Sequence, residues 1–253
     1  MSGLRPFFTY FGGKWRAAPK YPPPIYDTIV EPFAGSAGYS LRYPERKIIL
    51  VEKSPAIAGI WRYLIGASEK DILSLPLLEP GQSTDTLDVC QEARWLIGMW
   101  VSAGSGAPKK TLTEWAQRDP SHHKMCVWGK PVRARLASQI HTIRHWRIIE
   151  GDYSAAPDTA ATWFIDPPYE GMGKHYPCGS DEIDFASLGD WCRARRGQVL
   201  VCEAQGANRL PFPDFGTFKS NNANHQGRTR SAEALWMNDW PGAALWLPAK
   251  ESA

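Results

Sequence analysis

Ala161–Tyr169, with the sequence ATWFIDPPY, joins a short apolar run to a rigid corner. The run ATWFI is rich in aromatic and β-branched residues, which predicts a buried strand. Asp166 precedes a proline and is disfavoured in the α region, so its carboxylate should stay at the end of that strand. Pro167 and Pro168 have no N–H, so the chain leaves the sheet here with free carbonyl groups. Asp166 and the Pro167 carbonyl can accept the two hydrogens of an amino group on a planar substrate, while Tyr169 stacks on its ring. A strand followed by a plain turn is the alternative for this stretch taken alone.

Acidic residues also follow other predicted strands. Three strands, at 26–30, 47–51 and 147–150, lead to the acids Glu31, Glu52 and Asp152. The ends of parallel strands meet in the ligand crevice of an open α/β sheet, so these carboxylates should converge there. A further buried strand is predicted at 198–202, helices at 92–101, 136–146 and 185–195, and a terminal hairpin from 234–237 and 244–247. The pattern predicts an α/β fold with a nucleoside site.

The stretch after the first strand, Glu31–Gly38, reads EPFAGSAG. It predicts a glycine-bearing turn and then a helix from near Ser36, a good N-cap residue. The G-x-G-x-x-G fingerprint that cradles a pyrophosphate is missing, and Glu31 would repel an anion. A nucleoside without phosphates therefore fits, and cationic S-adenosylmethionine fits better than NAD. Near the N-terminus, adjacent glycines before Lys14 allow close approach to a ligand, although a turn with a solvated lysine is the alternative.

Composition limits the class of protein. A chain of 253 residues, 43% apolar, allows one large domain or one domain with an insertion. It has no apolar run near the roughly 18 residues of a membrane span, and its N-terminus lacks the apolar stretch of a signal peptide. Five cysteines without a C-x-x-C pair favour a reduced interior over a disulfide framework or a zinc site. We therefore expect a soluble, cytoplasmic protein.

Positive charge is concentrated in the middle of the chain. Lys109–Arg147 holds nine Lys and Arg against two acids, a net charge of +7, whereas the whole chain carries +3. Surface solvation would mix the signs more evenly, so we expect a polyanionic partner for this segment. We assign the tryptophans of the wider helical region to the core: Trp61, Trp95, Trp100, Trp115, Trp128 and Trp146. The residues predicted to contact nucleic acid, here and later in the chain, are Lys109, Lys110, Lys124, Lys130, Arg133, Arg135, Arg144, Lys174, Arg228 and Arg230.

Together these motifs resemble the Dam-like DNA adenine-N6 methyltransferases. The run YFGGK at 10–14 is similar to their N-terminal cofactor motif, EPFAGS at 31–36 to their cofactor loop, and DPPY at 166–169 to their catalytic motif. Glu52 matches the acid that takes the ribose, and Asp152 the acid near the cofactor's adenine. Ala37 departs from the pattern, since many members have glycine there. The resemblance rests on motifs at both ends of the chain. The middle of the chain matches the family through its position between these motifs.

The resemblance implies a Rossmann-like fold with a mixed, roughly seven-stranded sheet and a C-terminal hairpin. Its catalytic halves would be residues 1–60 and 147–253, with a mainly helical target-recognition insertion at 61–146. The implied cofactor residues are Tyr10, Gly12, Gly13, Lys14, Glu31, Pro32, Phe33, Ala34, Gly35, Ser36, Glu52, Lys53, Asp152, Tyr153 and Asp166. The implied catalytic residues are Asp166, Pro167, Pro168 and Tyr169.

The family also implies a mechanism. An adenine flipped out of double-stranded DNA would present its amine to Asp166 and Pro167, stack on Tyr169 and attack the methyl group of S-adenosylmethionine in line. S-adenosylhomocysteine would be the product, and no metal is required. A bacterial or phage enzyme without a paired nuclease is implied, with a homodimer left open.

Three alternatives remain. Similar corners serve enzymes that methylate RNA adenine or a protein amide. A decayed methyltransferase could act as a DNA-binding protein, although the acids at the strand ends are intact. A metal-dependent nuclease is suggested by Asp27 with Glu45–Lys47, but there the acid and lysine fall in a predicted turn after Pro44 rather than in a strand.

Overall fold

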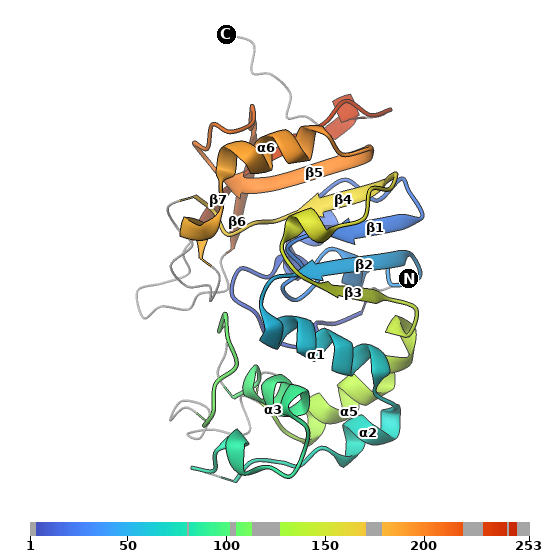
Figure 1. The fold of residues 1–253 in the computed structure, drawn as a ribbon, viewed down its shortest axis with the longest axis vertical. Helices are drawn as coiled ribbons and strands as arrows, with labels where there is room; N and C mark the ends of the chain where they lie inside the picture. The colour runs from blue at the N-terminus through green and yellow to red at the C-terminus, as the bar shows by residue number, and fades with distance from the viewer. Residues whose placement is uncertain are drawn as a thin grey trace.

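The computed structural model describes residues 4–79, 81–101, 105–112, 127–170, 179–219, 230–241 and 243–246. Within these residues, the centre of the fold is a seven-stranded sheet in the order β3-β2-β1-β4-β5-β7-β6 (Figure 1). The strands are β1 (Thr28–Glu31), β2 (Lys47–Glu52), β3 (Arg147–Glu150), β4 (Ala161–Ile165), β5 (Gly197–Ala204), β6 (Asp214–Lys219) and β7 (Arg230–Met237). Strands β1 to β5 pair in parallel, whereas β7 runs antiparallel to β5 and β6. The predicted α/β class with a mixed sheet is confirmed.

The direction in which the chain builds the sheet reverses between β1 and β4. From β1 it proceeds outward through β2 and β3, and it then returns to the other side of β1 with β4 and β5. Ligands of open α/β sheets bind at such a switch point, beyond the carboxyl ends of the strands. Glu31 ends β1, Glu52 ends β2, and Asp166 follows β4, so these three acids lie at one edge of the sheet.

The central strands are buried on both faces. Every residue of β4 is buried, as expected for a parallel strand that helices or loops cover on both sides. Its side chains alternate between two cores: Phe164 packs into the larger one with Leu50, while Trp163 packs into the smaller one with Leu188 of α6 (Phe185–Arg193). Figure 1 shows α6 lying over β5.

The other helices extend the larger core beyond the β3 edge. They are α1 (Pro55–Gly66), α2 (Glu69–Ser74), α3 (Gln91–Gly98) and α5 (Lys130–Gln139). Helix α1 contacts β2, β3 and α3, and α2 contacts α5, which groups these helices at the β3 end (Figure 1). Trp61, Trp100, Trp128 and Trp146 are buried in one core together with residues of the sheet. The predicted core role of these tryptophans is confirmed, and the 61–146 segment shares its core with the sheet.

Two local predictions are wrong. The helix expected from Ser36 is absent, and a short 3-10 helix, Ser40–Arg42, follows instead. The reason is the backbone of the loop, because Gly35 (φ 46°) and Ala37 (φ 51°) adopt the left-handed conformation that an α-helix excludes. The terminal hairpin is also different, since Ala243–Trp246 forms a 3-10 helix and β7 pairs with β6. The β6 sequence DFGTFK has no continuous apolar run, and its bulge near Gly216 disrupts the alternation that would have identified it.

Among the described residues, no helix is both long enough and apolar enough to cross a membrane.

Candidate ligand pocket at the carboxyl ends of the parallel strands

A pocket of about 260 Å³ opens at the switch point, close to the lower limit of roughly 300 Å³ typical of small-molecule sites. All fifteen residues predicted to hold a cofactor line it: Tyr10, Gly12, Gly13, Lys14, Glu31, Pro32, Phe33, Ala34, Gly35, Ser36, Glu52, Lys53, Asp152, Tyr153 and Asp166. Segments far apart in the sequence therefore contribute to one cavity. The pocket is also lined by residues outside the predicted cofactor set: Phe11, Gly38, Ser54, Phe164, Gly179, Glu182, Ile183 and Asp184.

Glycines in two segments allow the N-terminal motif to pack directly on the loop after β1. A Cβ atom on Gly13 would lie 2.9 Å from the Ser36 hydroxyl, and one on Gly35 would lie 2.9 Å from the Tyr10 ring. A Cβ on Gly38 would lie 2.5 Å from the Trp15 nitrogen, closer than such atoms ever approach. The glycines were predicted to let backbone approach a ligand. In the structure these glycines allow the N-terminal segment and the loop after β1 to pack closely against each other.

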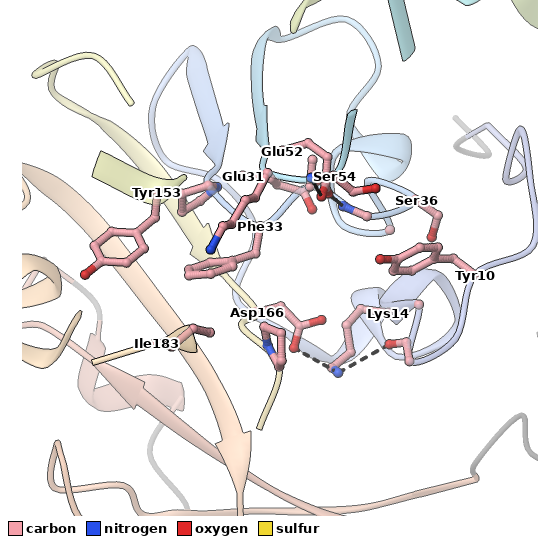
Figure 2. A pocket seen from close by; sticks show the side chains of 18 of the residues that line it. Tyr10, Lys14, Glu31, Phe33, Ser36, Glu52, Ser54, Tyr153, Asp166 and Ile183 are labelled. Atoms are coloured by element: carbon pink, nitrogen blue, oxygen red, sulfur yellow. Dashed lines mark hydrogen bonds and ion pairs between the residues drawn. The ribbon is translucent and has the colours of Figure 1, made fainter. Parts of the chain in front are cut away.

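Two buried acids fix this loop. Glu52 accepts hydrogen bonds from the backbone N–H of Gly35 at 2.9 Å and of Ser54 at 2.8 Å (Figure 2). Glu31 accepts one from the backbone N–H of Ser40 at 2.7 Å. Burial raises the pKa of Glu52, and it raises the pKa of Glu31 to about 8, because a charged carboxylate loses hydration here. Each carboxylate keeps further acceptor positions toward the pocket.

One end of the pocket is formed by rings and an aliphatic side chain. The Phe33 ring stacks on Tyr153, with centroids 5.6 Å apart and planes at 29°. Ile183 lies across the cavity from Phe33 (Figure 2). Asp152 lies at this end, where hydrogen bonds from the Ser154 hydroxyl and backbone lower its pKa. This arrangement suits a planar ring with a polar edge.

The other end holds a buried ion pair. Lys14 Nζ lies 2.9 Å from Asp166 Oδ1 and 3.4 Å from the Gly12 carbonyl oxygen, contacts drawn in Figure 2. Burial opposes charge on Lys14, but the attraction of Asp166 and its neighbours raises the pKa of Lys14 well above its ordinary value. Burial raises the pKa of Asp166, against the opposing effect of Lys14. The alternative of a solvated lysine is therefore wrong, because Lys14 is buried and pairs with a carboxylate of the chain itself.

The remaining residues of the proline corner divide between pocket and core. Pro168 lines the pocket, whereas Pro167 is buried. Tyr169 packs against the larger core and does not line the cavity. The Lys14 ammonium lies 4.8 Å from the centroid of its ring. In this conformation Tyr169 therefore contributes to the wall behind the ion pair.

Three of the arginines predicted to contact DNA donate hydrogen bonds to backbone carbonyl groups of the fold. Arg133 donates to the Leu75 carbonyl at 2.5 Å, and Arg135 to the Pro6 carbonyl at 2.9 Å. Arg144 donates to the Ile65 carbonyl at 2.6 Å and also to the Ala67 carbonyl. These bonds tie α5 and the turn after it to the N-terminal segment and to the ends of α1 and α2.

Three lysines of the same prediction lie at the surface of the described part of the chain. Lys109 and Lys130 are exposed, and Lys110 pairs with Asp85 at 2.6 Å. Arg230 is the first residue of β7. Lys124, Lys174 and Arg228 lie outside the described residues.

Comparison with known proteins gives no match, either among the family models or among the curated sequences. In the described part of the chain, no three His, Cys, Asp or Glu side chains are grouped so that they could hold a metal ion.

Proposed function

We propose that this protein is a Rossmann-like, S-adenosylmethionine-dependent DNA adenine-N6 methyltransferase of the Dam-like type. The observation that carries the proposal is a single pocket at the switch point of the sheet. It combines an end lined by Phe33, Tyr153 and Ile183, acids from four strand ends and the Lys14–Asp166 pair at the Asp-Pro-Pro corner. Each of these parts suits one portion of a methyl donor or of an amine that accepts a methyl group.

The charge of the pocket favours a cationic ligand over a phosphorylated one. Six acids line it (Glu31, Glu52, Asp152, Asp166, Glu182 and Asp184). Its two lysines each contact a carboxylate, Lys14 that of Asp166 and Lys53 that of Glu182 at 2.6 Å. Even with Glu31 counted as neutral, since burial raises its pKa to about 8, the acids of the pocket outnumber its two lysines. A nucleotide phosphate would therefore be repelled, whereas a sulfonium would be attracted. S-adenosylmethionine, when bound, would supply a methyl group carried on such a positive sulfur.

The side chains of the pocket can be assigned to portions of this ligand. Phe33 and Ile183 would hold the adenine between them, with Asp152 accepting a hydrogen bond at its edge. Glu52 keeps acceptor positions for ribose hydroxyls in addition to its two backbone contacts. Glu31, at the end of β1, would face the positively charged portion.

Asp166 would receive the amine that becomes methylated. Its side chain is 19% exposed, and Lys14 holds the carboxylate from behind through Oδ1. The carboxylate and the Pro167 carbonyl would each accept one amine hydrogen, so that the nitrogen lone pair is directed out of the ring plane. Positioning of this kind lowers the reaction barrier because the entropic cost of aligning the reacting atoms is met when the substrate binds.

Double-stranded DNA is the proposed substrate because of the +7 charge of Lys109–Arg147. Arg133, Arg135 and Arg144 are engaged within the fold, so the exposed lysines would carry more of the phosphate contacts. RNA adenine and protein amides are the alternatives that the experiment must separate.

The test is incorporation of labelled methyl groups from S-adenosylmethionine into unmethylated genomic DNA, followed by nucleoside analysis. We expect N6-methyladenine, and we expect Asp166→Ala to lower the rate at least about a hundredfold while the cofactor still binds. Asp158→Ala, eight positions upstream in an exposed ion pair, is the matched control and should keep full activity. Cofactor binding with methylation of RNA or protein instead of DNA would replace the proposed substrate. Failure to bind the cofactor would refute the proposal.

A further inference from the structure

A second buried carboxylate lies behind the Lys14–Asp166 pair. Glu233 belongs to β7, opposite Ala204 of β5, and is 7% exposed. Its Oε1 is 3.8 Å from Lys14 Nζ, so the ammonium lies between two carboxylates. No motif in the sequence singles out Glu233, and it does not line the ligand pocket.

Tyr21 holds this carboxylate in place. Its hydroxyl donates to Glu233 Oε2 at 2.5 Å. The Tyr21 ring stacks on Phe215, with centroids 5.0 Å apart and planes at 8°, and meets Phe164 edge to face. Because these rings fix the hydroxyl, Glu233 has a fixed direction toward Lys14.

The three charges do not cancel. Lys14 supplies one positive charge, whereas Asp166 and Glu233 supply two negative ones, in a region where all three groups are largely buried. Excess charge away from water is costly unless a further positive group compensates it. By formal charge, the group has one acid more than it has bases next to the carboxylate that faces the pocket.

We propose that Glu233 is a positioning residue for methyl transfer. Its carboxylate lies near the same Lys14 ammonium that contacts Asp166, and through Lys14 it changes the charge that Asp166 presents to the pocket. The inference rests on the proposed function. When the amine nitrogen bonds to the methyl carbon, the electrons of the carbon–sulfur bond stay on sulfur, and the nitrogen is positive until it releases a proton to water. Because Glu233 offsets part of the Lys14 charge, the group of Lys14, Asp166 and Glu233 presents a more negative field to this nitrogen than Lys14 and Asp166 would alone.

Loss of the Glu233 charge should lower the rate of methyl transfer without changing cofactor affinity. Glu233 lies behind Lys14 and outside the pocket lining, so it should have little effect on cofactor affinity. Glu233→Gln keeps the size of the side chain and an acceptor for Tyr21 but removes the charge. We expect kcat to fall about tenfold, less than for a group in direct contact with the reacting atoms, with the cofactor Kd unchanged within about twofold.

A double-mutant cycle with Lys14→Met tests whether Glu233 acts through Lys14. Single-turnover rates are measured for the wild type, both single variants and the double variant. In the Lys14→Met background, Glu233→Gln should change the rate less than about twofold. A second, full tenfold loss there would overturn the inference, as would an unchanged kcat in Glu233→Gln alone. Glu203→Gln removes a buried carboxylate that pairs with Arg209, and should lower stability without lowering kcat.

The same cycle is followed by urea unfolding, which does not depend on activity. Non-additive shifts of the urea midpoint would support the Lys14–Glu233 contact, and additive shifts would overturn it. A wild-type protein that transfers no methyl group refutes the proposed function and the catalytic role of Glu233 with it. Normal wild-type turnover with an unaffected Glu233→Gln refutes the role of Glu233 alone.

Discussion

Gly38→Ala should damage the pocket without touching any ligand. The added Cβ would lie 2.5 Å from the Trp15 nitrogen and 2.9 Å from both the nitrogen and the carbonyl carbon of Lys14. Ordinary contact begins at 3.4 Å, so the two backbone segments must separate by about 0.9 Å. Neither neighbour is a flexible side-chain end. Overpacking of this kind costs about 1–3 kcal/mol, and a cost near 2 kcal/mol lowers the melting temperature by about 4–8 °C in a domain of this size.

The displacement also affects the site, because Lys14 itself has to move. A shift of about 0.9 Å is roughly a third of the 2.9 Å distance between Lys14 Nζ and Asp166 Oδ1, so it would disturb this contact. Misplacement of a catalytic group by about 1 Å can lower an enzymatic rate about a hundredfold. We therefore expect a lower melting temperature and at least a tenfold loss in methyl transfer. Differential scanning calorimetry and the labelled-methyl assay measure the two effects.

Gly66→Ala is the matched control for this change. Gly66 is the last residue of α1 and has open space around the position of an added Cβ. Alanine should therefore stabilise the protein slightly, by up to about 1 kcal/mol, with unchanged activity. If Gly38→Ala matched Gly66→Ala in both measurements, the close packing of the N-terminal motif on the loop would be refuted.

Two further predictions concern charge. Burial raises the pKa of Glu31 from 4.5 to about 8, so the stability this group contributes is fully present below pH 4.5 and is lost as the pH rises through 8. A cationic ligand favours the charged form of Glu31, so the affinity for S-adenosylmethionine should increase between pH 7 and 9. Calorimetric titrations measure this affinity, and the prediction is contradicted if Glu31→Gln shows the same increase with pH as the wild type. Arg144→Met should lower the free energy of unfolding by about 1 kcal/mol through its lost carbonyl bonds, yet leave the salt dependence of DNA binding unchanged. Lys109→Gln with Lys110→Gln should instead reduce the salt slope by about 2, and binding titrations against salt that reverse this order would refute the assignment.

The parts of the fold that could be predicted depend on local patterns. The run ATWFI identified β4 because a strand buried on both faces must be apolar throughout. Glu31, Glu52 and Asp166 were located because an acid directly after such a run lies at the strand end. Strand β6 and the left-handed loop at Gly35 and Ala37 were missed, since bulges and unusual φ angles leave little trace in apolar periodicity.

By itself, the sequence determined the α/β class, the acids at the strand ends and fifteen of the residues that line one pocket. Tertiary structure alone decided which partners these residues have. Glu233 and Tyr21 are 212 positions apart in the chain, and their contact depends on where β7 enters the sheet. Arg133 and Arg144 were predicted to contact phosphates, and the fold adds carbonyl groups at the ends of α1 and α2 as partners for them. The physical reason is that the burial of a strand or helix is visible in the spacing of apolar residues along the chain. The pairing of charges depends instead on distances between residues that are brought together by folding.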